Sequence, residues 1–334
     1  MKNSLRLCSF ALCFSVASAF AGSTMSGKSG PTVETNSDAP SLSFEFDAQE
    51  SYVGAGDVER GGYSVRDFEE NDSLARLIFT PRIKFGILRL GFSYERFDFG
   101  IDGNDQDRNG VRGGRIFPIG INGPVFVPLA AELPNQLQAA NFIVGLDTKF
   151  SDSVLFRIEA HPGWYGAGID KVRGDTFRVP FIAGSTWIYS PTLQFTFGVG
   201  VNFEGKYPVL PGGGVRWQFA PKWVLNAVVP KPRLEYEACK NVTVYGGADL
   251  QAETYRVNER FGDFAGDRRL NNAYLTYSEV RAGVGFDWKI AHGITVSAEG
   301  GYVPYRTFDY ARPHVRYRED GGAPYAGVAL KAAF

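Results

Sequence analysis

Residues 280–288 read Val-Arg-Ala-Gly-Val-Gly-Phe-Asp-Trp, with an apolar side chain at every even position and a charged residue or glycine at every odd one. Successive side chains of a β-strand point to opposite faces, so this stretch predicts a strand with one apolar face and one polar, hydrated face. The same period of two begins at Leu42 and recurs up to Phe334. We therefore predict an all-β chain built from two-faced strands.

The connections between the predicted strands alternate in length. Tight turns are predicted at 84–86, 151–152, 190–191, 220–222, 239–241 and 291–293, and longer polar connections at 54–61, 100–136, 164–175, 205–212, 257–272 and 310–321. The short segment 230–232 is an exception, because a long connection is due there. Short periplasmic turns and long outer loops are typical of outer-membrane barrels. The alternation predicts a transmembrane antiparallel up-and-down β-barrel of about 14 strands, or 12 if 222–229 and 232–238 fold inward or belong to one bent hairpin.

Charged side chains occupy the face of the strands opposite to the apolar one. They are Arg76, Arg82, Arg89, Glu95, Asp147, Lys149, Arg157, Glu159, Asp249, Glu253, Glu279, Arg281, Asp287 and Glu299. An Arg or Lys on the lipid face costs about 2–4 kcal/mol at mid-membrane. We therefore expect these residues to face the lumen. Their mixed signs are compatible with a lumen cross-linked by ion pairs and with a weakly selective, water-filled one.

Four tryptophans provide an independent indication of orientation. Trp187, Trp217, Trp223 and Trp288 each lie within three residues of a predicted short turn, on the apolar face of their strand. Amphipathic rings collect at the headgroup level of a membrane, so we expect a membrane belt at the periplasmic side. The alternative is that these rings form the core of a soluble sandwich. A sandwich gives no reason for long and short loops to lie at opposite ends.

The N-terminus predicts export. Lys2 and Arg6 precede the apolar run 7–20, and Ala19-Phe20-Ala21 is a small-x-small cleavage site, so residues 1–21 are predicted to be a signal peptide. A retained anchor is the alternative, but the run is shorter than the roughly 20 residues that span a bilayer. Residues 22–41 are rich in Ser, Thr, Gly and Pro and predict a flexible segment. Residues 42–334 would then form the barrel, and the bacterial outer membrane is the expected location.

Charge and cysteine content exclude several other classes of protein. Removing Lys2 and Arg6 from the 35 basic residues leaves 33, against 36 acidic ones. This balance argues against a nucleic-acid surface, which would need an excess of basic residues. The predicted barrel makes outer-membrane lipids the expected surroundings. Cys239 is the one cysteine outside the predicted signal, which leaves no partner for an intrachain disulfide. The sequence does not indicate an oligomeric state.

Two resemblances support the barrel. The alternation that ends at the C-terminal Phe334 resembles the terminal signal by which outer-membrane barrels are recognised by the barrel-assembly machinery. Residues 211–216 read Pro-Gly-Gly-Gly-Val-Arg, followed by Trp217, a turn at 220–222 and Trp223, and then Pro-Lys-Pro-Arg-Leu-Glu-Tyr at 230–236. Over about residues 205–255 this resembles an uncharacterised family of predicted outer-membrane barrels. The resemblance implies a barrel and brings no known activity or catalytic residues.

The sequence predicts no enzymatic site. Its three histidines are His161 before a proline, His292 in a tight turn and His314 in a loop. A hydrolase in a barrel needs a nucleophile within hydrogen-bond reach of a base, and no serine lies within two residues of His161. A serine on a neighbouring strand and a lipase or protease activity stay open as the alternative. We expect no catalytic residues and no cofactor.

One local motif in the longest connection is a candidate metal site. Asp105, Asp107 and Asn109 alternate and are followed by a glycine, as in the first half of a calcium loop. Position twelve is Ile116, where an EF-hand has a bidentate glutamate. The other interpretation is a solvated loop held by Asx turns.

The sequence favours a passive, porin-like channel for small solutes. Twelve to fourteen strands make a barrel wider than the eight-stranded type that side chains fill. The connection 100–136 carries many apolar residues and is a possible constriction. One alternative is a plugged structural or adhesive barrel of the cell surface. Another is a transporter of hydrophobic molecules, although residues 22–41 are short and polar for the plug that such proteins use.

Overall fold

The computed structural model describes residues 42–60, 63–101, 111–112, 115–117, 125–127, 133–168 and 174–334. The predicted signal peptide, the segment 22–41 and the calcium candidates Asp105, Asp107 and Asn109 lie outside these residues. Within the described ranges, no helix is long and apolar enough to cross a membrane.

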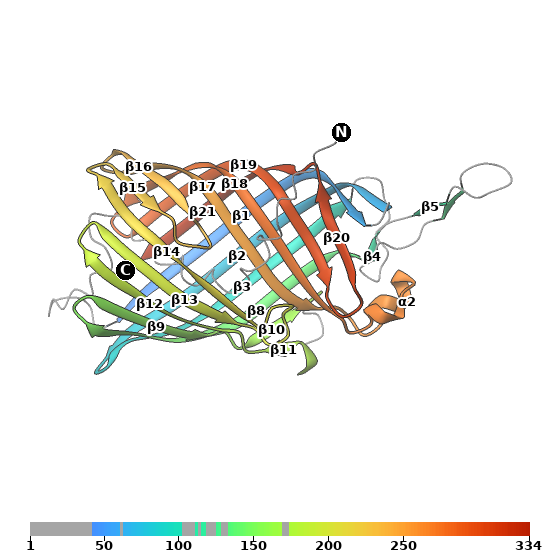
Figure 1. The fold of residues 1–334 in the computed structure, drawn as a ribbon, viewed down its shortest axis with the longest axis horizontal. Coiled ribbons are helices and arrows are strands. Elements are labelled where there is room, and N and C mark those ends of the chain that lie inside the picture. The colour runs from blue at the N-terminus through green and yellow to red at the C-terminus, as the bar shows by residue number, and fades with distance from the viewer. Residues whose placement is uncertain are drawn as a thin grey trace, which may run out of the picture.

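Seventeen strand segments form one continuous sheet (Figure 1). They are β1 (Leu42–Arg60), β2 (Tyr63–Ile83), β3 (Gly86–Ile101), β8 (Gln136–Ser151), β9 (Val154–Ala160), β10 (Gly163–Gly166), β11 (Phe177–Arg178), β12 (Phe181–Ser190), β13 (Leu193–Val201), β14 (Val209–Ala220), β15 (Trp223–Asn226), β16 (Arg233–Cys239), β17 (Val242–Arg256), β18 (Tyr274–Ala291), β19 (Ile294–Tyr310), β20 (Val315–Asp320) and β21 (Ala323–Ala333). In three places two segments follow each other within one wall strand: β9 and β10, β11 and β12, and β20 and β21. The wall therefore has 14 antiparallel strands, as the sequence predicts.

Pairing between the first and last strands closes the barrel. β1 pairs with β21 from Glu45↔Ala333 to Val53↔Tyr325. At the end of this seam, the Phe44 N–H donates to the Phe334 carbonyl at 2.9 Å, and the Phe334 N–H donates back at 3.1 Å. A closed wall leaves no sheet edge, which is one of the two ways in which a chain satisfies its backbone within lipid.

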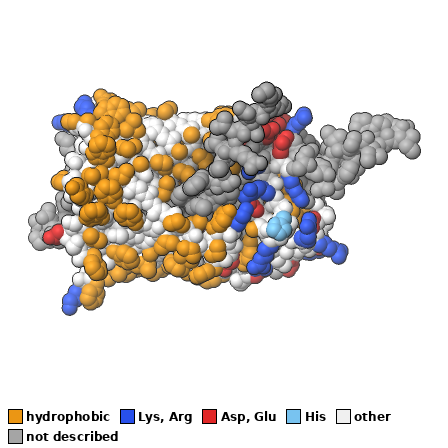
Figure 2. Space-filling view, in the orientation of Figure 1, with side chains coloured by type: hydrophobic (Ala, Val, Ile, Leu, Met, Phe, Trp, Pro, Cys, Tyr) orange, Lys and Arg blue, Asp and Glu red, His pale blue; other side chains and the backbone are white. Residues whose placement is uncertain are grey.

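The outer surface of the wall is apolar over much of its length. Figure 2 shows apolar side chains spread from the short-turn end over the wall, while most of the charged side chains in this view lie at the opposite end. Val284 and Val328, for example, are 68% and 58% exposed. A closed barrel with an apolar outer band is the architecture of outer-membrane proteins. Both ends of the described barrel lie at the short-turn end, which is the periplasmic end by the usual rule.

Two of the predicted long outer connections are wrong. Residues 54–60 belong to β1, and residues 315–320 form β20. β1 and β20 pair with each other at Asp57↔Asp320, Val58↔Glu319 and Glu59↔Arg318. These polar stretches look like loops in the sequence because they continue the wall beyond the apolar band, where both faces of a strand can carry charges.

The wall narrows at the outer end. Gly166, at the tip of β10, pairs in parallel with Arg256, at the tip of β17, and the Ala167 N–H donates to the Arg256 carbonyl at 3.1 Å. Between these two strands, the five wall strands from β11/β12 to β16 have already ended. At this level the wall consists of nine strands, namely β17, β18, β19, β20, β1, β2, β3, β8 and β10. We call this part the neck.

The connections near the neck contain the remaining elements. Short two-residue and three-residue strands form two separate ladders: β4 (Val111–Arg112) pairs with β7 (Leu133–Pro134), and β5 (Arg115–Phe117) pairs with β6 (Val125–Val127). A 3₁₀ turn, η1, spans Gly174–Thr176. Helix α2 (Phe261–Ala265) and the 3₁₀ turn η2 (Arg268–Leu270) lie in the connection 257–273, which we call the cap.

Candidate functional site

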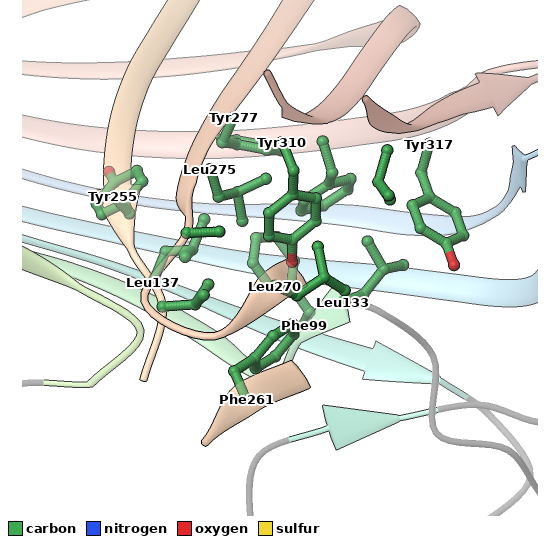
Figure 3. Packing of buried hydrophobic residues seen from close by; sticks show 14 of the residues in the cluster. Phe99, Leu133, Leu137, Tyr255, Phe261, Leu270, Leu275, Tyr277, Tyr310 and Tyr317 are labelled. Atoms are coloured by element: carbon green, nitrogen blue, oxygen red, sulfur yellow. The ribbon is translucent and has the colours of Figure 1, made fainter. Parts of the chain in front are cut away.

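Aromatic rings from opposite walls pack together inside the neck (Figure 3). The rings of Phe68 on β2 and Phe99 on β3 have centroids 5.3 Å apart. Phe308 on β19 lies 5.4 Å from Phe68 and 5.2 Å from Phe99. All three rings are buried. A barrel of about eight strands is just narrow enough for side chains to fill, and the nine-stranded neck follows the same rule.

The cap adds apolar side chains to this packing. Phe261, Ala265 and Leu270 are buried against the neck rings. The two ends of the cap lie side by side, since the Val257 N–H donates to the Ala273 carbonyl at 3.0 Å and the Asn272 N–H donates to the Asn258 carbonyl at 3.2 Å. The cap is therefore a loop between β17 and β18 whose two ends are hydrogen-bonded to each other.

Side-chain oxygens hold the two turns of the cap. The Asn271 Oδ1 accepts from the Gly262 and Asp263 N–H groups at 2.7 and 3.1 Å. Asp267 accepts from the Arg269 backbone N–H at 3.1 Å and from its guanidinium. The hydrogen bonds from Arg269 lower the pKa of the Asp267 carboxyl. The cap thus has its own local polar framework, outside the membrane-spanning strands.

A network of buried charges lies directly beneath the rings. Arg281 on β18 is fully buried, and its guanidinium reaches Glu70 at 3.1 Å, Asp72 at 3.3 Å and also Glu279. Arg306 on β19 binds Glu70 at 3.2 Å. Because β2 is not a neighbour of β18 or β19, these bonds cross the interior.

Two further groups complete the network. Arg306 binds Glu319 on β20 at 2.8 Å. The Tyr277 hydroxyl lies within hydrogen-bond distance of both Glu70 and Glu279. Breaking a buried ion pair by removing one partner costs several kcal/mol, so the network holds the neck strands in one arrangement.

Below the neck, a second group of ion pairs lines the side of the wall formed by β1, β3, β8 and β9. Arg89 reaches Glu159 at 2.9 Å, Glu45 at 3.3 Å and Asp147 at 3.9 Å. Arg157 also binds Asp147, at 2.6 Å. Asp147 on β8 joins the two strands beside it, whereas Arg89 on β3 reaches Glu45 and Glu159 across one intervening strand, β2 or β8. This side of the interior wall is therefore covered with charges that are already paired.

The other predicted lumen residues lie on the same face as these groups. Three of them form ion pairs: Arg76 with Asp47 at 3.0 Å, Lys149 with Asp152 at 2.6 Å and Asp249 with Lys231 at 2.7 Å. Glu253 lies 3.7 Å from Arg178, Asp287 lies 3.5 Å from Arg233, and Glu299 accepts a hydrogen bond from Tyr245 at 3.1 Å. Glu95 is half-buried below the neck, and Arg82 is exposed near the short-turn end. The structure gathers Glu279 and Arg281 in the neck and spreads the remainder along the wall.

Sequence reasoning missed Glu70, Asp72, Arg306 and Glu319. They share a strand face with buried aromatic residues, as Glu70 does with Phe68. A face that alternates between aromatic and charged residues gives no clear polar or apolar phase. The available signal was the exact period-two spacing of Phe68, Glu70 and Asp72, which continues the interior face of β2 beyond the membrane.

The four predicted belt tryptophans all lie on the outside of the wall. Trp187, Trp217, Trp223 and Trp288 are between 38% and 47% exposed. Each pairs into the ladder near a short turn, as Trp217 does with Leu193. Their depth in a membrane stays a prediction. Among the residues that the structure describes, no group of three or more His, Cys, Asp or Glu side chains is arranged to hold a metal ion.

Solved structures similar to this chain are outer-membrane proteins. The toluene transporter TbuX of Ralstonia pickettii is 10% identical, with a TM-score of 0.40 over 87% of this chain and 89% of that chain. The toluene transporter TodX of Pseudomonas putida is 10% identical, with a TM-score of 0.34 over 89% and 91%. OprB of Pseudomonas putida is 9% identical, with a TM-score of 0.36 over 88% and 94%. Scores this low carry no argument about the solute of the present barrel.

No curated protein matches the chain. A family described as a domain of unknown function, DUF6268, matches residues 133–317. The matched stretch begins at β7, contains the cap and the tip of β10, and ends within β20. It covers more than half of the chain, and this outer-membrane barrel therefore belongs to the DUF6268 family.

Proposed function

We propose that the protein is a passive outer-membrane channel for small polar solutes and that the packed neck is its closed gate. The observation that carries this proposal is that the interior becomes narrower and less polar toward the outer end of the barrel. A polar, ion-paired wall of fourteen strands leads up to an apolar, side-chain-filled ring of nine strands.

The wide part of the barrel suits hydrated solutes. A barrel of fourteen strands is wider than side chains alone can fill. Interior charges such as Lys231 and Glu45 are still 41% and 40% exposed. The other interior carboxylates are mostly held by arginines, so the wall offers paired charges and hydrogen-bonding groups without a strong trap for any one ion.

The neck has to open for a solute to pass. The cap is its most separable part, because it is one segment with adjacent ends and it contributes Phe261, Ala265 and Leu270 to the core. Of the predicted constriction 100–136, Leu133 is a described residue that packs in the neck, and most of that segment lies outside the described residues.

A planar-bilayer measurement tests the gate. In the opened variant, residues 259–271 are replaced by a three-residue Gly-Ser-Gly link between Asn258 and Asn272, and Phe99 and Phe308 are changed to Ala. We expect rare or no conductance steps from the wild type and frequent steps from this variant. A heat-dependent shift of mobility in detergent verifies that both proteins are folded barrels. Silence from both folded proteins contradicts the channel.

The buried Arg281 and Arg306 network supports a second candidate function, a permanently plugged structural barrel of the cell surface. Ion pairs that cross the interior stabilise the wall and do not form a passage for a solute. The absence of conductance steps from the opened variant in a planar bilayer would favour this function. The polar wall below the neck gives less support to transport of hydrophobic molecules, since such a solute would pass a long charged surface.

A further inference from the structure

The short-turn end of the barrel has an unequal distribution of charge. Arg82 on β2, Lys149 on β8, Lys289 on β18 and Lys331 on β21 each face the interior within two residues of the end of their strand. By the same criterion, Glu237 on β16 is the one acidic side chain among the described strands. We call these four cations the mouth ring.

The mouth-ring cations differ in exposure, and two of the ring's lysines have no bound partner among the described residues. Arg82, Lys149 and Lys331 are exposed, and Lys289 is half-exposed. Neither Lys289 nor Lys331 has a hydrogen bond or an ion pair from its side chain to any residue that the structure describes. Lys149 binds Asp152, a carboxylate that is 98% exposed in the turn, and such surface pairs contribute little.

Two interior carboxylates near the mouth ring, Asp47 and Asp287, already have partners. Asp47 is the cross-strand partner of Lys331, and Asp287 lies two residues from Lys289 on β18. However, Asp47 is bound to Arg76 at 3.0 Å, and Asp287 accepts from Ser297 at 2.7 Å. Lys289 and Lys331 therefore keep positive charges that no described carboxylate binds, and the four cations of the mouth ring outnumber Glu237, the one acidic side chain at this level.

The turns at the same end add further positive charge. Lys84, Lys222 and Lys240 are exposed turn residues, and Figure 2 shows Lys and Arg side chains at this rim of the barrel. Clefts with one sign of charge and low-dielectric walls concentrate ions of the opposite sign. The mouth ring lies inside such a wall, whereas the turn lysines point into open solvent.

We propose that the mouth ring makes small anions, such as carboxylates and phosphates, the preferred solutes of the barrel. The passage of these anions rests on the proposed channel function, but their attraction to the mouth does not. The two can therefore be tested separately, because the charge at the mouth is measurable in a barrel that does not conduct.

A thiol reporter measures the potential at the mouth. Ala329 is half-buried on the interior face of β21, two residues inward from Lys331. In a full-length background with Cys8, Cys13 and Cys239 changed to Ser, Ala329→Cys is reacted with a sulfonate-bearing and a trimethylammonium-bearing methanethiosulfonate. At about 0.01 M salt, where screening extends over roughly 30 Å, we expect the anionic reagent to be favoured about tenfold over its ratio with a free small thiol.

Two matched triple variants assign the effect. Changing Lys149, Lys289 and Lys331 to Gln should reduce the preference to within about twofold of the free thiol, because the mouth ring loses three of its four charges. Changing Lys84, Lys222 and Lys240 to Gln removes the same charge from the turns and should leave most of the preference. About 1 M salt, with a screening length of roughly 3 Å, should abolish it in all proteins.

Several outcomes overturn the proposal. These are equal reactivity toward both reagents in the parent, equal losses in the two triple variants, or a folded Ala329→Cys barrel whose introduced thiol reacts with neither reagent. Thr243→Cys, on the interior face of β17, is the second reporter if Ala329→Cys does not fold. Bilayer silence with a retained thiol preference would contradict the channel and leave the anionic preference of the mouth standing.

Discussion

Gly166 on β10 and Arg256 on β17 are paired neighbours at the outer end of the barrel, although five wall strands separate β10 from β17 at the short-turn end. The constriction is thus made by the wall itself, with the cap and the neck rings filling the narrowed ring. In the part of the chain that the structure describes, the neck is closed by wall strands, neck rings and cap alone.

Arg281→Met should destabilise the barrel by about 3–5 kcal/mol, because Glu70, Asp72 and Glu279 lose their main buried counter-charge. Urea unfolding in lipid vesicles, followed by tryptophan fluorescence, measures this loss. Arg268→Met is the matched control, since Arg268 is 90% exposed and its removal should change stability by less than about 0.5 kcal/mol. Similar losses in the two variants would show that the network is not holding the neck.

Gly163→Ala should destabilise by about 1–3 kcal/mol. A Cβ at this position would lie 2.4 Å from the Ala140 carbonyl oxygen and 2.5 Å from the Asn141 Cα, both of which are backbone atoms of β8. Gly174→Ala is the control, because its Cβ meets nothing within 4 Å. The same unfolding measurement applies, and an unchanged midpoint for Gly163→Ala would mean that β8 and β10 separate without cost.

The cap should loosen at low pH. The folded pKa of Asp267 is lowered by Arg269, so its contribution to local stability is present above the ordinary aspartate pKa of about 3.9 and is lost as pH falls through the folded value. Hydrogen exchange at residues 261–270 should therefore be unchanged between about pH 7 and 5 after correction for intrinsic rates, and should accelerate below about pH 4. Asp267→Asn should show the faster exchange at neutral pH, whereas Asp320→Asn should not.

The four exposed tryptophans should lie at the periplasmic headgroup level. Variants that keep one tryptophan each, at 187, 217, 223 or 288, are reconstituted with lipids brominated at different depths. We expect stronger quenching by shallow labels than by labels near the bilayer centre, because amphipathic rings prefer the interface. Maximal quenching by the deepest label would contradict the belt.

Phe334→Ala should reduce the amount of folded barrel in the outer membrane several-fold while leaving the thermal stability of the folded fraction nearly unchanged. The ring is 52% exposed and contacts Phe44 at a centroid distance of 5.0 Å, so little packing is lost. Phe150→Ala, at an 86% exposed residue, is the control. Equal yields of the two variants would contradict a role of Phe334 in recognition by the assembly machinery.

The membrane-spanning part of the fold was predictable because one physical rule acts on every strand there. In 280–288 the lipid demands an apolar residue at each even position, and the strand phase follows directly. The same rule predicted the interior face that carries Arg89 and Asp147, and the alternation of short and long connections predicted the strand number.

The neck was not predictable, because alternate apolar positions are required only where a strand is in contact with lipid. The period-two spacing of Phe68 and Glu70 indicates that the interior face of β2 continues, but it does not indicate that the wall narrows there. The pairing of Gly166 with Arg256 depends on where five other strands stop, which is a property of the whole wall. Local periodicity contains no information about such distant partners.

The narrowing also changes the parity of the wall. Neighbouring strands of an up-and-down barrel alternate in direction, so an even number closes with every contact antiparallel, as the fourteen strands do. Nine strands cannot alternate around a ring, and one contact between like-directed strands is unavoidable. That contact is Gly166 with Arg256, the one parallel pairing within the described sheet, and any barrel that loses an odd number of strands along its axis must contain its equivalent.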